Sequence, residues 1–102
     1  SLEQLVKFTS SNAAKIFGMY PKKGTLDKDA DADITMIDLK KESKVSSDMF
    51  GGFSDYIVYE GLLLKGWPVK TIVRGQLVAE DFEVVGNLGY GEFVQRHSSK
   101  NY

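Results

Sequence analysis

Residues 12–38 constrain the fold most, because the spacing of their apolar residues changes from a helical period to a period of about two. Up to Phe17, apolar residues recur three and four positions apart. In residues 33–38, apolar and polar residues alternate, and several are β-branched, which favours a strand. A proline–glycine turn at residues 20–24 separates the two patterns. The segment therefore predicts a helical part followed by strands.

The helical part is predicted to be two short helices. Residues 2–8 place their apolar side chains on one helical face, and the Thr-Ser-Ser sequence at 9–11 is expected to interrupt that helix. Asn12 is expected to cap a second helix over residues 12–17. Gly18 is well placed to end this second helix, because glycine readily adopts the positive φ of that position.

Beyond residue 24, the chain predicts short strands joined by polar loops. Residues 33–38 are expected to form the first strand and residues 40–48 a solvated loop, which includes the lysine cluster at 40, 41 and 44. Residues 56–59 are expected to form a strand or an extended segment. Residues 62–64 are predicted to be another strand that ends at Gly66-Trp67-Pro68.

The clearest local pattern is a β-hairpin. Residues 69–73 and 76–80 have the composition of strands, and Arg74-Gly75 lies between them as a tight turn. Helices that precede a run of strands predict an α+β fold, mainly β, with an antiparallel or mixed sheet.

Composition excludes several classes of function. The chain has 102 residues, a net charge of −1 and no cysteine. It therefore has no disulfide, thiolate nucleophile or zinc–thiolate site, and no basic field that would attract nucleic acid or an anionic membrane. No apolar run approaches the roughly 18 residues of a membrane span. The absence of cysteine fits a cytoplasmic protein, which is the location we expect.

The acidic run from Asp27 to Asp38 resembles a calcium loop only in part. Carboxylates at 27, 29, 31 and 38 match positions 1, 3, 5 and 12 of an EF-hand loop. However, Ala32 stands where the loop needs glycine, and the following residues read as a strand. We therefore interpret the run as an exposed acidic turn before a strand.

Three further motifs favour structural interpretations. The glycines of residues 86–91 have the reverse of the dinucleotide-binding spacing, without a strand-to-helix context. His97, the only histidine, is predicted to be exposed and has no serine partner that would suggest a triad. Glu80 and Asp81 are interpreted as turn residues. The residues themselves thus predict no catalytic, cofactor-binding or metal-binding site in this chain.

Four aromatic residues, Phe50, Phe53, Tyr56 and Tyr59, surround a pair of glycines. Basic residues are not interleaved with them, so base stacking is not favoured. We expect them to pack in a core or in an interface.

A set of residues in the first third of the chain resembles the C-terminal part of the dihydropyrimidinase and D-hydantoinase family of cyclic amidohydrolases. Members typically read T-S-x-N-P-A-K-x-F-G-L-Y-P-x-K-G, followed by G-x-D-A-D-[LI]-x-[LIV]-x-D. The matching residues are Thr9, Ser10, Asn12, Ala14, Lys15, Phe17, Gly18, Tyr20, Pro21, Lys23, Gly24, Asp31, Ala32, Asp33, Ile34 and Asp38.

The resemblance continues along nearly the whole chain in the family's order. Residues 59–61, Tyr-Glu-Gly, resemble a family element, residues 71–75 resemble its T-x-V-R-G hairpin, and residues 89–93 resemble its closing G-x-G-x-F. Two positions depart from the pattern. Ala13 replaces a proline and Asp29 replaces a glycine, which we expect to loosen a helix start and a turn.

The resemblance implies that residues 1–24 are the last helices of a TIM-type barrel with a connecting turn, and that residues 25–102 are most of a small β-sandwich. It also implies a parent enzyme that hydrolyses cyclic amide C–N bonds at a binuclear metal centre, expected to hold zinc. Four histidines, a carboxylated lysine and an aspartate form that centre in the family. One histidine cannot supply this set, so no catalytic, cofactor or metal residue is transferred to this chain.

The implied partners are the rest of the parent chain, including N-terminal strands of the sandwich, and further copies in a homo-oligomer. An alternative is the non-enzymatic branch of the family, which resembles collapsin response mediator proteins and acts through protein interaction. Another is an independent β-rich binding module. The Arg74-Gly75 hairpin mildly favours the enzymes.

Overall fold

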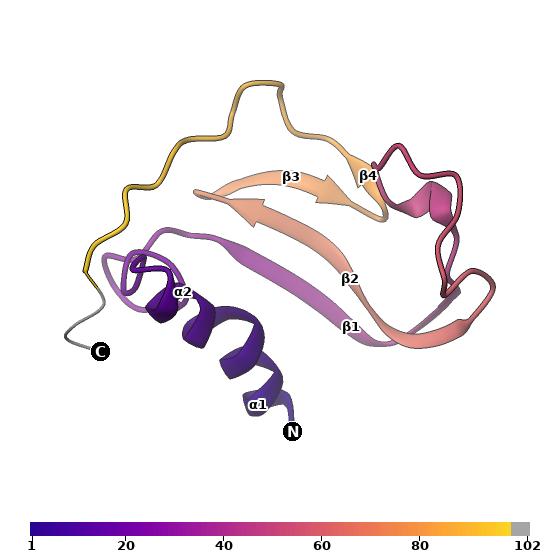
Figure 1. The fold of residues 1–102 in the computed structure, drawn as a ribbon, viewed down its shortest axis with the longest axis horizontal. Helices are drawn as coiled ribbons and strands as arrows, with labels where there is room; N and C mark the ends of the chain where they lie inside the picture. Colours follow the sequence, from indigo (N-terminus) through magenta and orange to yellow (C-terminus); the bar gives the residue numbers. More distant parts are fainter. Residues whose placement is uncertain (99–102) are drawn as a thin grey trace. The chain divides into compact units, whose positions relative to one another are not determined.

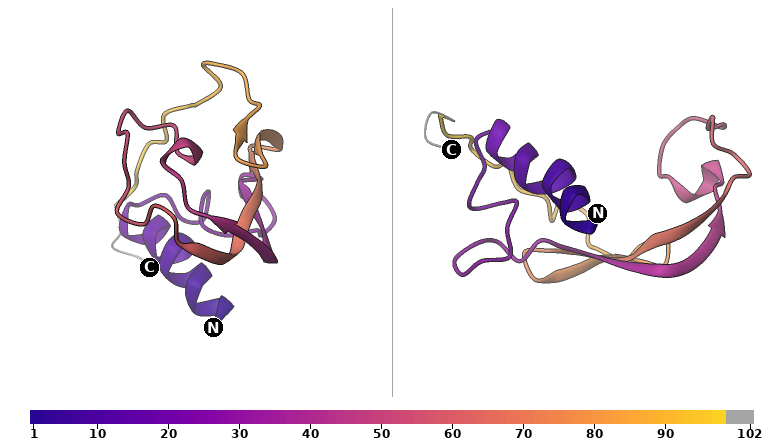
Figure 2. Two further views of the ribbon diagram at one scale, coloured as in Figure 1. Left: turned by 90° about the vertical axis from the view of Figure 1, so that its right-hand side faces the viewer. Right: turned by 90° about the horizontal axis from the view of Figure 1, so that it is seen from below.

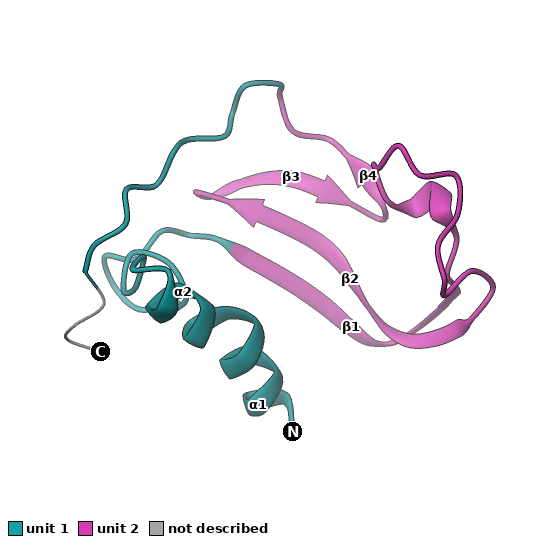
Figure 3. Cartoon of the chain, viewed as in Figure 1, with its two compact units in different colours: residues 1–33, 88–102 teal, residues 34–87 magenta. Residues whose placement is uncertain are grey.

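A computed structural model describes residues 1–98, and the chain divides into two compact units (Figure 3). Unit 1 consists of residues 1–33 and the C-terminal residues from Leu88 onward, and unit 2 consists of residues 34–87. Unit 1 is helical at its start, and unit 2 holds the β-sheet (Figure 1). No helix within residues 1–98 has the length and apolar composition needed to cross a lipid bilayer.

One uninterrupted helical segment opens unit 1. It consists of α1 (Leu2–Val6), the π-helical turn η1 (Lys7–Ser11) and α2 (Asn12–Ile16). The predicted break at residues 9–11 is therefore wrong, because the chain widens into a π turn there and stays helical. The amide of Asn12 donates to the carbonyl of Lys7, and the Thr9 hydroxyl donates to the carbonyl of Leu5 at 2.7 Å.

The two ends of this segment are capped differently from one another. Ser1 and Gln4 form a capping box at the start, whereas Asn12 has helical φ and ψ of −66° and −42° and is not the predicted cap. At the other end Gly18 has φ of +71°, as predicted. Its amide donates to the carbonyl of Lys15, and the amide of Met19 donates to that of Ala14, which is a Schellman motif.

Unit 2 is a four-stranded antiparallel sheet in the order β1-β2-β3-β4 (Figures 1 and 2). Its strands are β1 (Ile34–Lys44), β2 (Leu63–Val73), β3 (Gln76–Glu80) and β4 (Glu83–Val84). This arrangement confirms the predicted α+β fold, mainly β, with an antiparallel sheet. The described residues form one sheet, and the β-sandwich that the resemblance implies stays a prediction.

The longest strands extend beyond their predicted bounds. Residues 40–44, expected in a loop, continue β1, and Glu42, Ser43 and Lys44 pair with Lys65, Leu64 and Leu63 of β2. The rest of that expected loop holds the 3-10 turn η2 (Ser47–Met49). β2 passes through Gly66, Trp67 and Pro68 instead of ending there. Register shifts interrupt the β1–β2 pairing, so neither strand alternates strictly over its whole length. An alternation pattern therefore could not predict their full extent.

Two tight turns complete the sheet. Arg74 and Gly75 have φ of +44° and +79°, and Val73 pairs with Gln76, which confirms the predicted hairpin with a primed turn. Asp81 and Phe82, between β3 and β4, also have positive φ, of +49° and +67°. Residues 56–59 were expected to be extended or a strand, and residues 58–60 instead form a turn.

Few apolar side chains of the described residues are buried. Unit 1 buries Ala14, and unit 2 buries Val45 and Trp67. Trp67 packs edge-on against Phe82, with ring centroids 5.3 Å apart, and its indole N–H donates to the carbonyl of Leu64. Large hydrophobic side chains elsewhere in both units are exposed, including Phe8 at 68%, Phe53 at 110% and Leu88 at 104%. Each unit therefore has a very small core of its own.

Candidate functional site

The acidic run is organised around one lysine. The ammonium of Lys23 lies 2.8 Å from Oδ2 of Asp31 and also donates a hydrogen bond to Oδ2 of Asp33. The backbone supports this cluster, because the amide of Lys23 donates to the carbonyl of Met19 and the amide of Asp31 donates to the carbonyl of Lys22. Lys23 therefore links the start of the turn to the acidic residues that precede β1.

The environment of Lys23 favours its charged form. Partial burial by itself would lower the pKa of the Lys23 amine, but hydrogen bonds to Asp31 and Asp33 and their negative charges outweigh this effect. The net result is a raised pKa for Lys23. Its side chain is only 16% exposed, so the ion pairs are partly shielded from water.

The acidic run forms a turn in which several carboxylates are paired with other groups of the chain. Asp31 and Asp33 face the Lys23 ammonium, and Asp27 accepts a hydrogen bond from the Thr25 hydroxyl at 2.6 Å. Carboxylates already paired with an ammonium are poor calcium ligands. Within residues 1–98, no three His, Cys, Asp or Glu side chains gather into a group that could hold a metal ion.

His97 belongs to the contact between the C-terminal residues and the end of the helical segment. Its amide donates to the carbonyl of Gly18 at 2.8 Å, and its side chain is exposed as predicted. It also lines a hollow of about 390 Å³ beside the acidic turn, together with Tyr20, Lys28 and Asp29. His97 is the one imidazole among the residues that line this hollow.

The remaining motifs have structural roles. Glu80 lies 3.4 Å from Lys70, and Asp81 lies 3.3 Å from Lys41, so both are paired residues next to the β3–β4 turn. Gly86 packs against Val78, and no helix follows residues 86–91 within the described chain. The glycine-rich segment therefore lacks the helix N-terminus of a nucleotide site.

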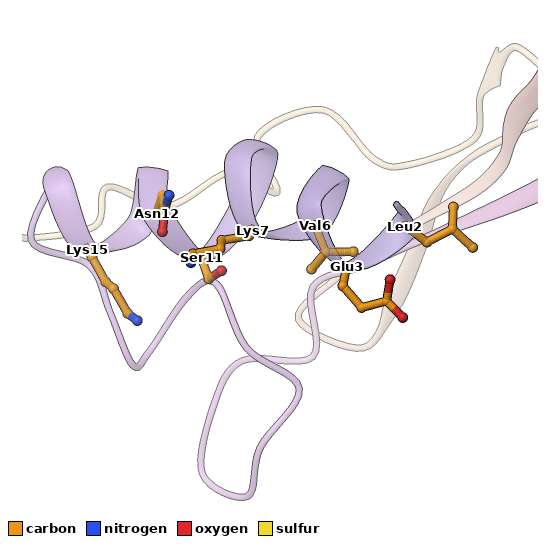
Figure 4. Close-up of a pocket in the computed structure, with 7 residues that line it drawn as sticks. All are labelled: Leu2, Glu3, Val6, Lys7, Ser11, Asn12 and Lys15. Atoms are coloured by element: carbon orange, nitrogen blue, oxygen red, sulfur yellow. The ribbon is translucent and has the colours of Figure 1, made fainter.

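Another hollow lies along the helical segment (Figure 4). It measures about 550 Å³, and the residues that line it all come from this one segment: Leu2, Glu3, Val6, Lys7, Ser11, Asn12 and Lys15. A hollow bounded by one helix is an open surface of that helix. Its apolar residues, Leu2 and Val6, are 53% and 58% exposed.

A second exposed surface lies in unit 2. We name residues 45–62, which connect β1 to β2, the aromatic loop. Phe50, Phe53, Tyr56 and Tyr59 are 49%, 110%, 72% and 58% exposed. A core position, one of the two expectations for these residues, is excluded within this chain, whereas an interface position agrees with their exposure.

Comparison with known proteins shows which family the chain resembles. Residues 1–78 match the model of the amidohydrolase family. The chain is 43% identical over 98 residues to an L-hydantoinase of Paenarthrobacter aurescens and 40% identical over 96 residues to a D-hydantoinase of Geobacillus stearothermophilus. These alignments cover 96% and 94% of the chain but 21% and 20% of the two relatives.

The fold agrees with the sequence match. A solved structure described as "Structure of D-hydantoinase" superposes with a TM-score of 0.91 and 34% sequence identity, over 97% of this chain and 22% of that one. The chain thus spans about a fifth of the length of its relatives. The match to the family model over most of its length shows that the chain belongs to the amidohydrolase family.

Proposed function

We propose that this chain is a structural part of a larger hydrolase that acts on cyclic amide C–N bonds, of the hydantoinase or dihydropyrimidinase type. In this proposal the chain supplies the last barrel helices and one layer of the β-sandwich, and it is not catalytic by itself. The proposal draws on the relatives named as hydantoinases and on the share of their length that the chain covers.

One observation carries the structural role. Large hydrophobic side chains are exposed along the helical segment and along the sheet, while each unit buries one or two apolar residues. Exposed apolar side chains that gather on one element, as Leu2, Leu5 and Val6 do on α1, usually mark an interface with other protein. The rest of the parent chain would cover these surfaces, and further copies in a homo-oligomer are the second partner that we propose.

The metal centre that the family resemblance implies does not fit the described residues. They contain no cluster of His, Cys, Asp or Glu that could hold a metal ion, and the whole chain has one histidine. We therefore assign no step of amide hydrolysis to this chain. Its proposed contribution is to complete the folded scaffold on which the parent holds its catalytic groups.

Activity measurements on the purified chain test this proposal. Dihydrouracil and hydantoin would be incubated with the chain in the presence of Zn²⁺, with the full-length parent as the positive control. We expect ring opening by the parent and none by the chain. Metal-dependent turnover by the chain alone would refute the non-catalytic role, and an inactive parent would refute the assignment to cyclic amide hydrolysis.

A further inference from the structure

The aromatic loop combines a fixed base with outward-facing aromatic side chains. At its base, the amide of Val45 donates to the carbonyl of Leu62, and the amide of Gly61 donates to the carbonyl of Val45, both at 2.8 Å. Val45 itself is buried. The loop is thus closed by strand-like hydrogen bonds at the end of the β1–β2 pair (Figure 1).

Polar groups of the loop are directed at its own backbone. The carboxylate of Glu60 accepts a hydrogen bond at 2.8 Å from the amide of Ser47, the first residue of the 3-10 turn η2, whose N-cap is Ser46. The hydroxyl of Ser47 donates to the carbonyl of Asp55, and the hydroxyl of Ser54 donates to the carbonyl of Tyr56. These bonds shape the loop from within, whereas the aromatic rings contribute no core to it. Phe53 is fully exposed, and Val58 is 80% exposed.

The charged residues of the aromatic loop are all acidic. Between Lys44 and Lys65 the chain has three acidic residues, Asp48, Asp55 and Glu60, and no lysine, arginine or histidine. All three acids are exposed. A surface that matches this loop would offer an apolar centre for the rings and basic side chains at its rim, because complementary charges favour docking in one register.

We propose that the aromatic loop docks against an apolar surface rimmed by lysine or arginine in the part of the same polypeptide that lies outside these 102 residues. This inference rests on the proposed function, in which the chain is about a fifth of a larger protein, as it is of its relatives. A surface on the same polypeptide is present at high effective concentration, so it would be occupied before a second molecule could compete. Docking would bury Phe53 and Tyr56, the most exposed rings of the loop.

Site-specific photo-crosslinking in the full-length parent tests the inference. Phe53 would be replaced by p-benzoylphenylalanine, with the same replacement at Lys28, an exposed residue of the acidic turn, as the matched control. We expect the probe at position 53 to link to a peptide outside the 102 residues within one subunit, and the probe at position 28 to give at least about fivefold less product. A product with the mass of two subunits, or no protein product at position 53, would overturn the inference.

A charge reversal tests the basic rim. Asp55→Lys would place a cation in the loop and is expected to lower the crosslink yield from position 53 several-fold. Glu83→Lys makes the same charge change at an exposed residue of β4, outside the loop, and is expected to leave the yield unchanged. Equal effects of the two substitutions would contradict a basic rim.

Activity of the same preparations separates this inference from the proposed function. A parent that hydrolyses cyclic amides but gives no intrasubunit product at position 53 would overturn the docking alone. A parent that lacks this activity but gives that product would overturn the assigned reaction and leave the docking intact.

Discussion

The amide of His97 donates a hydrogen bond to the carbonyl of Gly18 at 2.8 Å, and a Cβ atom on Gly18 would lie 2.0 Å from the carbonyl oxygen of His97. Gly18 also has φ of +71°, where residues with a Cβ are strained. One glycine therefore ends the helical segment and makes room for the C-terminal residues of unit 1. The same glycine is part of the motif that resembles the hydantoinase family.

Gly18→Ala is expected to release this contact. The methyl group would collide with the backbone of His97 and strain the positive φ, at a combined cost of about 1–3 kcal/mol in local stability. Amide hydrogen exchange in the full-length protein would measure the effect, as faster exchange at His97. Gly91→Ala is the matched control, because no atom lies within 4 Å of a Cβ at that position. Unchanged protection of His97 in the Gly18 variant would refute the close contact.

Lys23→Met is expected to loosen the turn before β1. Removal of the ammonium leaves Asp31 and Asp33 as neighbouring carboxylates without their cation, which should cost about 1–2 kcal/mol of local stability. Lys22→Met is the control, since Lys22 is exposed. Hydrogen exchange at the Asp31 amide would report the loosening, and equal exchange in both variants would contradict a structural role for Lys23.

The pH dependence of the same cluster has a defined sign. The pKa of Lys23 is raised in the folded chain, so the ion pairs stabilise the fold fully below the unfolded lysine pKa of about 10.4. That stabilisation is lost as the pH rises through the folded value. Competitive acetylation at pH 8–11, read by mass spectrometry, should show Lys23 deprotonating above the ordinary lysine pKa. Earlier deprotonation of Lys23 would contradict the predicted direction.

Asp29→Gly is expected to stabilise the acidic turn. Asp29 has φ of +68° where related sequences are expected to carry glycine, and glycine adopts this conformation without strain. The gain should be about 0.5–1 kcal/mol, reduced somewhat by the greater freedom of glycine in the unfolded chain. Lys28→Gly lacks the positive φ and should be neutral or destabilising. Thermal unfolding of the two variants would be compared, and a loss of stability in Asp29→Gly would contradict this account.

The chain alone is expected to self-associate. β1 lies at one edge of the sheet within the described residues, and its Met36, Ile37 and Leu39 are 47%, 47% and 53% exposed. Such edges pair readily with another chain. Size-exclusion chromatography with light scattering over a dilution series should show species larger than a monomer. Ile37→Lys should shift the distribution toward monomer more than Glu83→Lys does, and a monomer at every concentration would refute the expectation.

Local patterns predicted the local structure best. The Gly18 stop, the strand expected over residues 33–38 and the Arg74-Gly75 turn depend on neighbouring residues, and all three are found, with the strand beginning at Ile34. The predictions failed where pairing between residues far apart in the sequence, or a local adjustment of the backbone, determines the secondary structure. Residues 40–44 are polar, yet they belong to β1 because β2 lies beside them. The chain stays helical at Thr9 because it forms a π turn there, which helix propensities do not predict.

The candidate surfaces were harder to predict than the elements. The sequence placed Phe50, Phe53, Tyr56 and Tyr59 in a core or an interface, because an aromatic side chain suits both. Their exposure excludes a core position within the described residues, and an interface position stays a prediction. The role of Lys23 was also missed, although two acids at 31 and 33 and a turn at residues 20–24 could have suggested a lysine that bridges them.

Fragment complementation tests the central claim most directly. The 102-residue chain and the remainder of its parent would be expressed separately, purified, mixed and assayed for hydrolysis of hydantoin and dihydrouracil. We predict negligible turnover by either piece and restored turnover by the mixture, because the chain completes the scaffold without supplying catalytic groups. Turnover by the chain alone, or full activity of the remainder without it, would contradict the claim.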